Sequence, residues 1–247
     1  MIHDAIQALR DGQVILLYDF DDRERETDLV MAAESVTPRH VCQLRRDAGG
    51  LMCVAIDPIA CSKLGIPYMV DVLRYAGSCG NGFEAIESIY ERVGDIPYDS
   101  KSSFSLWVNH RKTYTGITDI DRALTITKLA EVTKQSLSGT QVNFGSQFRS
   151  PGHVPLLRAA PGLLKDRRGQ TELSIVLARA ANVTPAMVMC EMLDGGTGRA
   201  LSREMALEYA RQHGLAFIEG REVEEILGEG SMAARSAGSK DPVLTNI

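Results

Sequence analysis

Apolar runs of strand length alternate with helix-periodic segments along most of the chain. Near the N-terminus, Ile2, Ala5, Ile6 and Leu9 share one helical face, and Gly12 follows where that helix should end. The apolar runs predict strands at residues 14–18, 29–33, 51–56, 104–109, 186–193 and 215–218, and a further apolar run covers 154–160.

Capping signals place most of the other helices. Thr37 is an N-cap followed by Pro38 at the first helical position, which predicts a helix toward Asp47 that stops at Gly49–Gly50. Asp57–Pro58 predicts a short helix in the same way. Further helices are expected from Asp119 or Asp121 to about Lys134, over 171–181 and over 202–213.

Two segments break this alternation. Residues 74–100 are rich in Gly and Pro and predict a surface insertion that holds one helix near 83–92. After Gly228 the chain turns to Gly, Ser and Ala, so a disordered tail is expected over 229–247. The remainder, 1–228, predicts a single α+β domain with a mixed sheet and surrounding helices. A three-layer α/β sandwich is the alternative.

Composition places the chain among ordinary globular proteins. Its 247 residues are 44% hydrophobic and 24% charged, and no apolar stretch reaches the roughly 18–20 residues of a membrane span. The five cysteines include no Cys-x-x-Cys pair, and the N-terminus does not resemble a signal peptide, so a cytoplasmic protein with reduced thiols is expected. The formal charge of −5 argues against a nucleic-acid partner, and no membrane partner is expected either.

Most of that charge lies in one decapeptide. Residues 19–28 hold six acids and two bases, a net charge of −4 between two predicted strands. Such a run is either a solvated loop or a site, and both interpretations stay open. Carboxylates that converge in one loop repel one another and favour a cation such as Mg²⁺, although the glycine of an EF-hand loop is absent.

Three further features carry potential chemistry. His153 follows Pro151–Gly152, a turn that would expose an imidazole, although a lone histidine is more often structural. Residues 165–172 place arginines and a glycine before a helix, which suits an anion site or a solvated basic turn. Glu191 ends an apolar run, where it is either buried with a raised pKa or facing water. Together these features predict a Mg²⁺-dependent enzyme acting on a small phosphorylated substrate.

Six segments resemble, in order, the motifs of the 3,4-dihydroxy-2-butanone 4-phosphate synthase family. The match covers about residues 1–218, and an insertion at 74–110 is similar to that of the archaeal branch. The segments are DFDDRERETDLVMAAE (19–34), GGLMCVAI (49–56), TGITDIDRALTI (115–126), RSPGHVPLLRA (149–159), RRGQTE (167–172) and CEML (190–193).

The resemblance implies a lyase of riboflavin biosynthesis. It would convert D-ribulose 5-phosphate to L-3,4-dihydroxybutan-2-one 4-phosphate and formate as a cytoplasmic homodimer that needs Mg²⁺ or Mn²⁺. The cation would stabilise enediolate-like species. By position, the catalytic residues implied are His153, Glu191, Asp19 and Cys53, and the substrate-binding residues are Arg23, Glu24, Asp28, Thr115, Arg167, Thr171 and Glu191.

The implied metal ligands contain one departure from the family. Glu24 matches one ligand and Glu26 is a second candidate, but the histidine of the R-x-G-H-T motif is Gln170 here. An amide oxygen can ligate Mg²⁺, so metal binding can persist. Because the geometry and charge of the ligand differ from those of a histidine, weaker metal binding is expected. Arg25 is a lesser departure and is expected to pair with Asp21 or Asp22. A non-catalytic sugar-phosphate-binding homologue and a phosphosugar isomerase remain alternatives.

Overall fold

The computed structural model describes residues 2–80 and 82–226, so the expected tail at 229–247 and the last residues of the 1–228 domain lie outside it. Within that part, seven strands form one mixed sheet in the order β4-β5-β3-β6-β2-β1-β9. The strands are β1 (Ile15–Tyr18), β2 (Thr27–Ala32), β3 (Cys53–Ile56), β4 (Phe104–His110), β5 (Phe148–Arg158), β6 (Ala186–Glu191) and β9 (Phe217–Glu219); β7 (Leu193–Asp194) pairs with β8 (Arg199–Ala200) in a separate hairpin.

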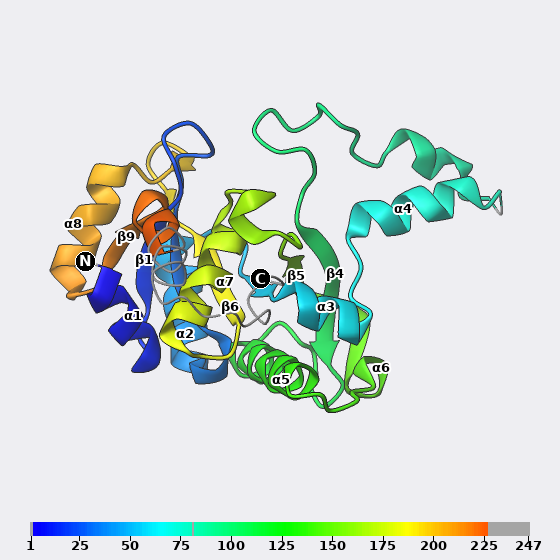
Figure 1. Ribbon diagram of the computed structural model, residues 1–247, viewed down its shortest axis with the longest axis horizontal. Helices are drawn as coiled ribbons and strands as arrows, with labels where there is room; N and C mark the ends of the chain where they lie inside the picture. Colours follow the sequence, from blue (N-terminus) through cyan, green and yellow to red (C-terminus); the bar gives the residue numbers. More distant parts are fainter. Residues whose placement is uncertain (1, 81, 227–247) are drawn as a thin grey trace, which may run out of the picture.

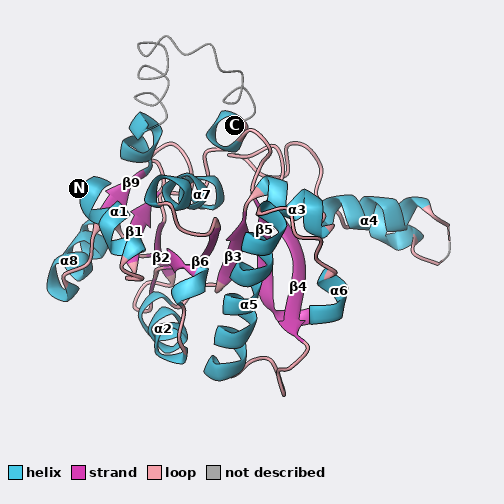
Figure 2. Ribbon diagram, turned by 60° about the horizontal axis from the view of Figure 1, so that its bottom comes forward, coloured by secondary structure: helices cyan, strands magenta, loops and turns pink. Residues whose placement is uncertain are grey.

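Helices cover both faces of this sheet (Figures 1 and 2). Buried side chains of α2 (Pro38–Gln43), α3 (Pro58–Leu64), α5 (Asp119–Leu137) and α8 (Arg203–His213) share one hydrophobic core with the sheet. Those of α1 (Ile2–Arg10) and α7 (Gln170–Ala181) form a second core on the opposite face. The expected single domain with a mixed sheet is confirmed, and its layers are those of a three-layer sandwich.

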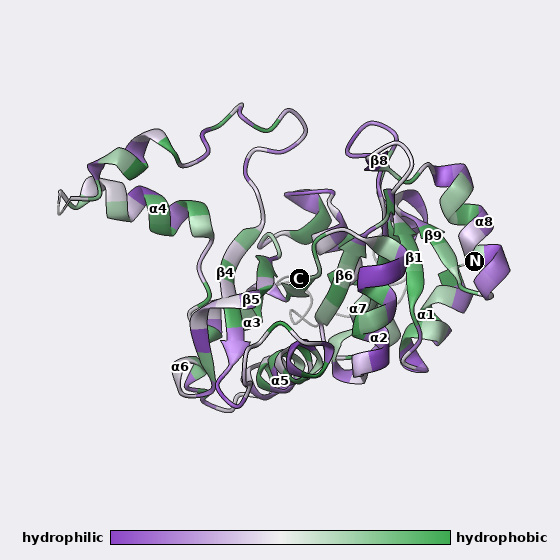
Figure 3. Ribbon diagram, turned by 180° about the vertical axis from the view of Figure 1, so that it is seen from behind, coloured by the Kyte–Doolittle hydropathy of each residue, from purple (hydrophilic) through white to green (hydrophobic). Residues whose placement is uncertain are grey.

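The hydropathy pattern explains why the middle of the sheet is buried on both faces. Strands β1, β2 and β3 are buried at every position. Figure 3 shows that the central strands are coloured mainly as hydrophobic. A strand covered by helices on both faces needs a continuous apolar run instead of an alternating one. The predicted runs at 14–18, 29–33 and 51–56 therefore lie on true strands, with shifts of one or two residues at their ends.

Three predicted elements are corrected by the structure. A helix that the sequence did not predict, α4 (Met69–Ser78), leads into the insertion, and only a 3₁₀ turn (Glu84–Ser88) lies where a helix near 83–92 was expected. The helix expected to reach Asp47 leaves α geometry after Gln43, because residues Leu44–Ala48 form a π-helical turn before Gly49. The run at 154–160 is the end of a longer strand, β5, which begins at Phe148 after the short helix α6 (Phe144–Gln147).

The insertion is set apart from the body of the molecule. In Figure 1, α4 and the segment after it extend to one side, and the chain then returns past the top of β4. Among the described residues, no helix is long and apolar enough to cross a membrane.

Candidate active site

The acidic decapeptide is an ordered loop between β1 and β2, built around Asp19. The Asp19 side chain is only 1% exposed, and its two oxygens accept hydrogen bonds from the backbone N–H groups of Glu24 and Glu26, each at 3.0 Å. These bonds fold the loop back over the end of the antiparallel β1–β2 pair. Asp19 therefore shapes the loop, and the wet-loop interpretation does not hold for its inner residues.

Five carboxylates lie close together in and beside this loop: Asp19, Glu24, Glu26, Asp28 and Glu191. Asp28 on β2 lies directly across from Glu191 on β6, and burial together with the Glu191 charge raises the pKa of Asp28 well above its ordinary value. Burial, then the charges of Glu24, Glu191 and Asp19, raise the pKa of Glu26 to about 7. Burial also raises the pKa of Glu191. This cluster holds more negative charge than its surroundings neutralise, so a proton or a cation stabilises it.

The sequence left two interpretations of Glu191 open, a buried carboxylate with a raised pKa and a carboxylate that faces water. It is the last residue of β6 and is half-buried, and one of its oxygens accepts a hydrogen bond from the Leu51 backbone N–H at 2.7 Å. The raised pKa favours the buried interpretation over a carboxylate that faces water. Gly50 permits this approach, since a Cβ there would lie 2.4 Å from a Glu191 carboxylate oxygen.

Arg23 connects the loop to the rest of the site. Its guanidinium lies 3.0 Å from Glu24 and 3.1 Å from Asp19, and it donates to the amide oxygen of Gln170 at 3.1 Å. It also forms an ion pair of 2.6 Å with Asp99, a residue of the insertion. The Arg23 side chain is 5% exposed, so its charge is balanced mainly by protein carboxylates.

The beginning of α7 is the segment where the sequence predicts an anion site or a solvated basic turn. Gly169 caps the helix without a side-chain hydrogen bond, which leaves the first backbone N–H groups of this 12-residue helix without an acceptor from a capping side chain. Arg167 lies just before it, 2.8 Å from Glu172 and 2.7 Å from Asp99. The Thr171 hydroxyl is 3.1 Å from that of Ser103.

Asp99 therefore bridges the two arginines that the resemblance assigns to the substrate. Its carboxylate is 6% exposed and contacts Arg23 and Arg167 at the same time. A carboxylate held between two guanidinium groups makes the same charge-assisted contacts that a phosphate group makes with arginines. The sequence analysis missed Asp99, because its segment of the insertion carries only a general turn signal.

His153 belongs to a second group of residues at the β4–β5 edge. Its turn lies inside β5, yet the imidazole is exposed as expected. The Asn109 side chain on β4 contacts His153 and the Thr115 backbone carbonyl, so Thr115 and His153 are neighbours. Asp121 accepts backbone hydrogen bonds from Thr115 and Gly116, and these donors, Gly116 first, lower the pKa of Asp121.

Cys53 begins β3, across from Met189 of β6. It is 1% exposed, and burial followed by the Glu191 charge raises its thiol pKa well above the ordinary value. The side chain is thus a neutral thiol below the carboxylate cluster, which suits a residue that lines the site more than a nucleophile. Arg25 does not form the expected carboxylate pair. It donates to the backbone carbonyl of Asp21, and Asp21 and Asp22 pair with Arg221 and Arg168.

Most predicted residues thus lie in one group of contacts, and the remaining two, Thr115 and His153, lie in the second group. The first group contains Asp19, Arg23, Glu24, Glu26, Asp28, Arg167, Gln170, Thr171 and Glu191, with Cys53 below it. Within residues 2–80 and 82–226, no three His, Cys, Asp or Glu side chains converge on a preformed metal position. Glu24 and Gln170 instead meet at Arg23.

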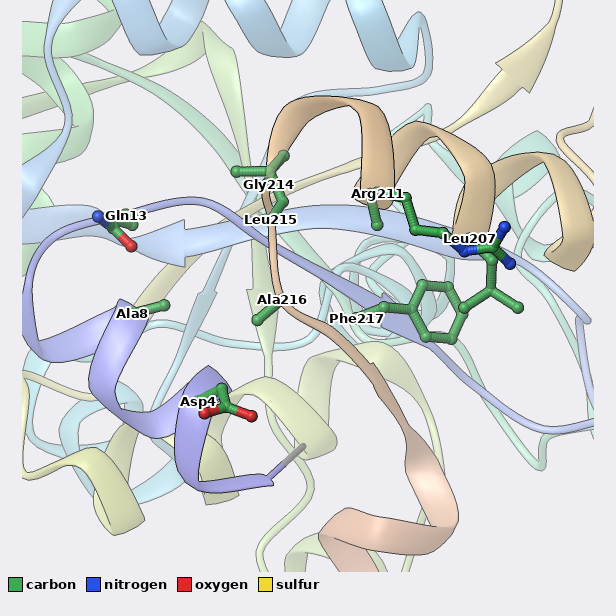
Figure 4. Close-up of a pocket in the computed structure, with 10 residues that line it drawn as sticks. Asp4, Ala8, Gln13, Leu207, Arg211, Gly214, Leu215, Ala216 and Phe217 are labelled. Atoms are coloured by element: carbon green, nitrogen blue, oxygen red, sulfur yellow. The ribbon is translucent and has the colours of Figure 1, made fainter.

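Two cavities differ in their relation to the predicted site. One of about 200 Å³ lies beside the anion-binding residues and is lined in part by Lys101, Arg158 and Arg167. Another of about 450 Å³ lies between α1, α8 and β9, where Asp4, Gln13, Arg211 and Phe217 line it (Figure 4). The second cavity holds none of the predicted site residues.

Comparison with known proteins decides the family. The sequence profile of the 3,4-dihydroxy-2-butanone 4-phosphate synthase family matches residues 3–226. The chain belongs to this family. Membership confirms the predicted class, a synthase of riboflavin biosynthesis.

Individual synthases are similar over nearly the whole chain. That of Methanosarcina mazei is 56% identical over 224 residues, which cover 91% of this chain and 90% of that protein. That of Archaeoglobus fulgidus is 52% identical, covering 90% and 92%. Both organisms are archaea, as the insertion predicted. A solved synthase structure in complex with two magnesium ions is 29% identical with a TM-score of 0.69, covering 94% of this chain and 96% of that one.

Proposed function

We propose that this synthase converts D-ribulose 5-phosphate into L-3,4-dihydroxybutan-2-one 4-phosphate and formate. The observation that carries the proposal is the carboxylate cluster around Asp28 and Glu191, which lies in one group of contacts with Arg23, Arg167 and the start of α7. Proton transfer and phosphate binding thus share one site. The two products together contain the atoms of the substrate, so the reaction needs no external oxidant.

The roles follow from charge and burial. Arg167, Thr171 and the N-terminal N–H groups of α7 bind the phosphate, with Arg23 beside them. Glu191 and Glu26 have raised pKa values, so each can take a proton from a sugar carbon or hydroxyl and return it. His153, from the group of residues at the β4–β5 edge, is the third residue proposed to take part in proton transfer. Asp19 keeps the loop in the shape that presents Glu24 and Glu26.

The residues present fit a divalent cation, Mg²⁺ or Mn²⁺. Asp28 Oδ1 is buried without a hydrogen-bond partner, and the surrounding carboxylates have raised pKa values, so the site favours added positive charge. Glu24 and the Gln170 amide oxygen would hold the ion, with Glu26 as a further ligand, because Mg²⁺ needs only one or two carboxylates besides water and substrate oxygens. When bound, it supplies electrostatic stabilisation of neighbouring sugar oxygens that become negative.

A homodimer is the proposed assembly, with the two groups of residues meeting between subunits. Exposed apolar side chains near Thr115 support it: Tyr114 is 94% exposed, Ile120 70% and Ile117 51%. Leu51, beside Glu191, is 38% exposed. Large exposed apolar side chains near a site are typical of an interface. The five free thiols, three of them buried, support a cytoplasmic location.

The test is to incubate the protein with ribulose 5-phosphate and Mg²⁺ and to follow formate, the C4 phosphate product and pentose phosphates by NMR. Formate is expected, and Glu191→Gln, which keeps the hydrogen bond acceptor but removes the base, should abolish it. Xylulose or ribose 5-phosphate without formate would favour an isomerase. Saturable binding of ribulose 5-phosphate without any product would favour a non-catalytic homologue.

A further inference from the structure

The buried amide of Asn109 contacts the exposed imidazole of His153. Asn109 lies on β4 and its side chain is fully buried, with 0% exposure. Its Oδ1 accepts a hydrogen bond from the His153 backbone N–H at 2.8 Å, and its Nδ2 lies 3.1 Å from His153 Nδ1. Nδ2 also donates to the Thr115 backbone carbonyl at 3.4 Å.

These contacts fix which way the amide points. A backbone N–H can only donate, so the Asn109 atom facing it must be the carbonyl oxygen. The Thr115 carbonyl can only accept, so the other Asn109 atom must be the NH₂ group. Both neighbours therefore oppose a flip of the amide, and His153 Nδ1 faces a hydrogen bond donor.

Two glycines make room for this arrangement. A Cβ on Gly116 would lie 1.9 Å from Asn109 Nδ2, and Gly116 also has a φ of +95°, which other residues rarely adopt. A Cβ on Gly152 would lie 2.0 Å from the backbone of Val108. Glycines on both sides thus allow the amide to contact the imidazole.

A neutral imidazole carries one proton, on either Nδ1 or Nε2. Because Nδ1 faces an N–H donor, it must present its lone pair, and the proton must be on Nε2. The His153 side chain is exposed, and no hydrogen bond is formed at Nε2 by any residue in the described ranges 2–80 and 82–226. The Nε2–H group is thus available to a substrate.

We infer that Asn109 is a positioning residue that holds neutral His153 as its Nε2–H tautomer, so that His153 donates a hydrogen bond or proton to a substrate oxygen and does not act as the base. The inference rests on the proposed function. It divides the chemistry: Glu191 removes protons, and His153 stabilises negative charge as it develops on oxygen.

The direct test is ¹⁵N NMR of the full-length protein labelled on its histidines, at about pH 8, where an ordinary imidazole is neutral. The His153 signals are identified by their loss in His153→Gln. We expect a protonated Nε2 and an unprotonated Nδ1 in the unsubstituted protein. A protonated Nδ1 would overturn the inference, whatever the activity of the enzyme, so this result is independent of the proposed function.

Asn109→Asp tests the cause. A carboxylate accepts where the amide donates, so the proton of His153 should move to Nδ1. With ribulose 5-phosphate, kcat should fall about 100-fold, while KM changes little because Arg167 and Thr171 still bind the phosphate. An unchanged tautomer in this variant would overturn the role of Asn109. The matched control is Asn143→Asp. Asn143 is the exposed N-cap of α6, a position that aspartate also fills, so this variant should change neither the His153 tautomer nor kcat.

Discussion

Gln170 replaces a histidine expected from the family, and the structure shows why a glutamine suits this position. It is 6% exposed at the start of α7, its oxygen accepts from Arg23 at 3.1 Å, and its nitrogen lies 3.4 Å from the Glu26 carbonyl. One side chain thus joins the acid loop to α7 with an acceptor and a donor. A neutral imidazole can also offer one of each, so the connection does not require a glutamine.

Restoring the family residue should therefore be tolerated. In Gln170→His, we expect synthase activity to be preserved or raised, and half-maximal activity to need less Mg²⁺, because the substitution restores the histidine that the R-x-G-H-T motif of the family places at this position. Activity is measured across a Mg²⁺ titration. A clear loss of activity at saturating Mg²⁺ would show that position 170 does not act as a ligand.

His110 predicts a pH dependence of stability outside the site. It is 4% exposed at the end of β4 and packs edge-on against Phe148. Burial, then the charges of Lys128 and Lys112, lower its pKa below the ordinary 6.5. The unfolded chain therefore binds more protons than the folded one, so the stabilisation is complete above about pH 6.5 and is lost as the pH falls toward the folded pKa.

The measurement is urea unfolding at about pH 7.5 and 5.5, which bracket the ordinary pKa of histidine. His110→Gln should lower the free energy of unfolding at the higher pH but reduce its decrease on acidification. An equal decrease in the substituted and unsubstituted proteins would contradict the assignment to His110.

Residue chemistry was predictable where the sequence carried a motif. The residues of the acid loop, the α7 start and Glu191 were found by their motifs, and the structure joins them. Asn109 and Asp99 were missed, since an asparagine in a strand and an aspartate in a loop are common. Their importance comes from the tertiary contacts with His153, Arg23 and Arg167.

At the scale of elements, the insertion is the part that the sequence predicted least well. Several of its apolar side chains stay exposed, with Tyr75 at 73%, Ile89 at 71% and Val93 at 89%. In α4, only Val70 and Gly77 are buried, so the apolar face of this helix is short, and the Gly- and Pro-rich composition of the segment hid it. The sheet strands were easier to predict, because burial on both faces demands continuous apolar runs. The early start of β5 was not predicted, because Pro151–Gly152 signal a turn. In the structure, these two residues lie within β5, and a shift in the β4–β5 register between Val108 and Asn109 accommodates them.

The insertion also reaches the site through Asp99. Because its carboxylate pairs with Arg23 and Arg167, the substrate phosphate has to compete with it. Asp99→Asn removes this competing charge and keeps the shape, so the KM for ribulose 5-phosphate should fall, and inorganic phosphate should inhibit at lower concentration. Steady-state kinetics measure both. A higher KM would show instead that Asp99 organises the arginines for the substrate. The control is Asp71→Asn, which changes an exposed residue of α4.

At the scale of the whole molecule, one sheet between two helical layers brings Asp28, Glu191 and the start of α7 together, while His153 stays with Asn109 and Thr115 at the β4–β5 edge. The sequence predicted the layers, but it could not show this separation, because residue spacing along the chain contains no information about assembly. The proposed dimer would account for the exposed apolar side chains near the two groups.

Co-expression of two inactive variants tests that assembly. His153→Ala and Glu191→Gln each remove one group, so each dimer of a single variant should be inactive. If the groups meet between subunits, a mixed dimer has one intact site, and random mixing should restore about a quarter of the activity of the unsubstituted enzyme. No recovery in a preparation shown to contain mixed dimers would place both groups in the same subunit.

The most direct test of the central claim is the ratio of formate formed to ribulose 5-phosphate consumed. Uniformly ¹³C-labelled substrate is incubated with the enzyme and Mg²⁺, and both species are followed in one NMR time course. The carboxylate cluster beside the phosphate site predicts one formate and one four-carbon phosphate for each substrate molecule consumed. Consumption of the substrate with no labelled formate would contradict the assigned reaction.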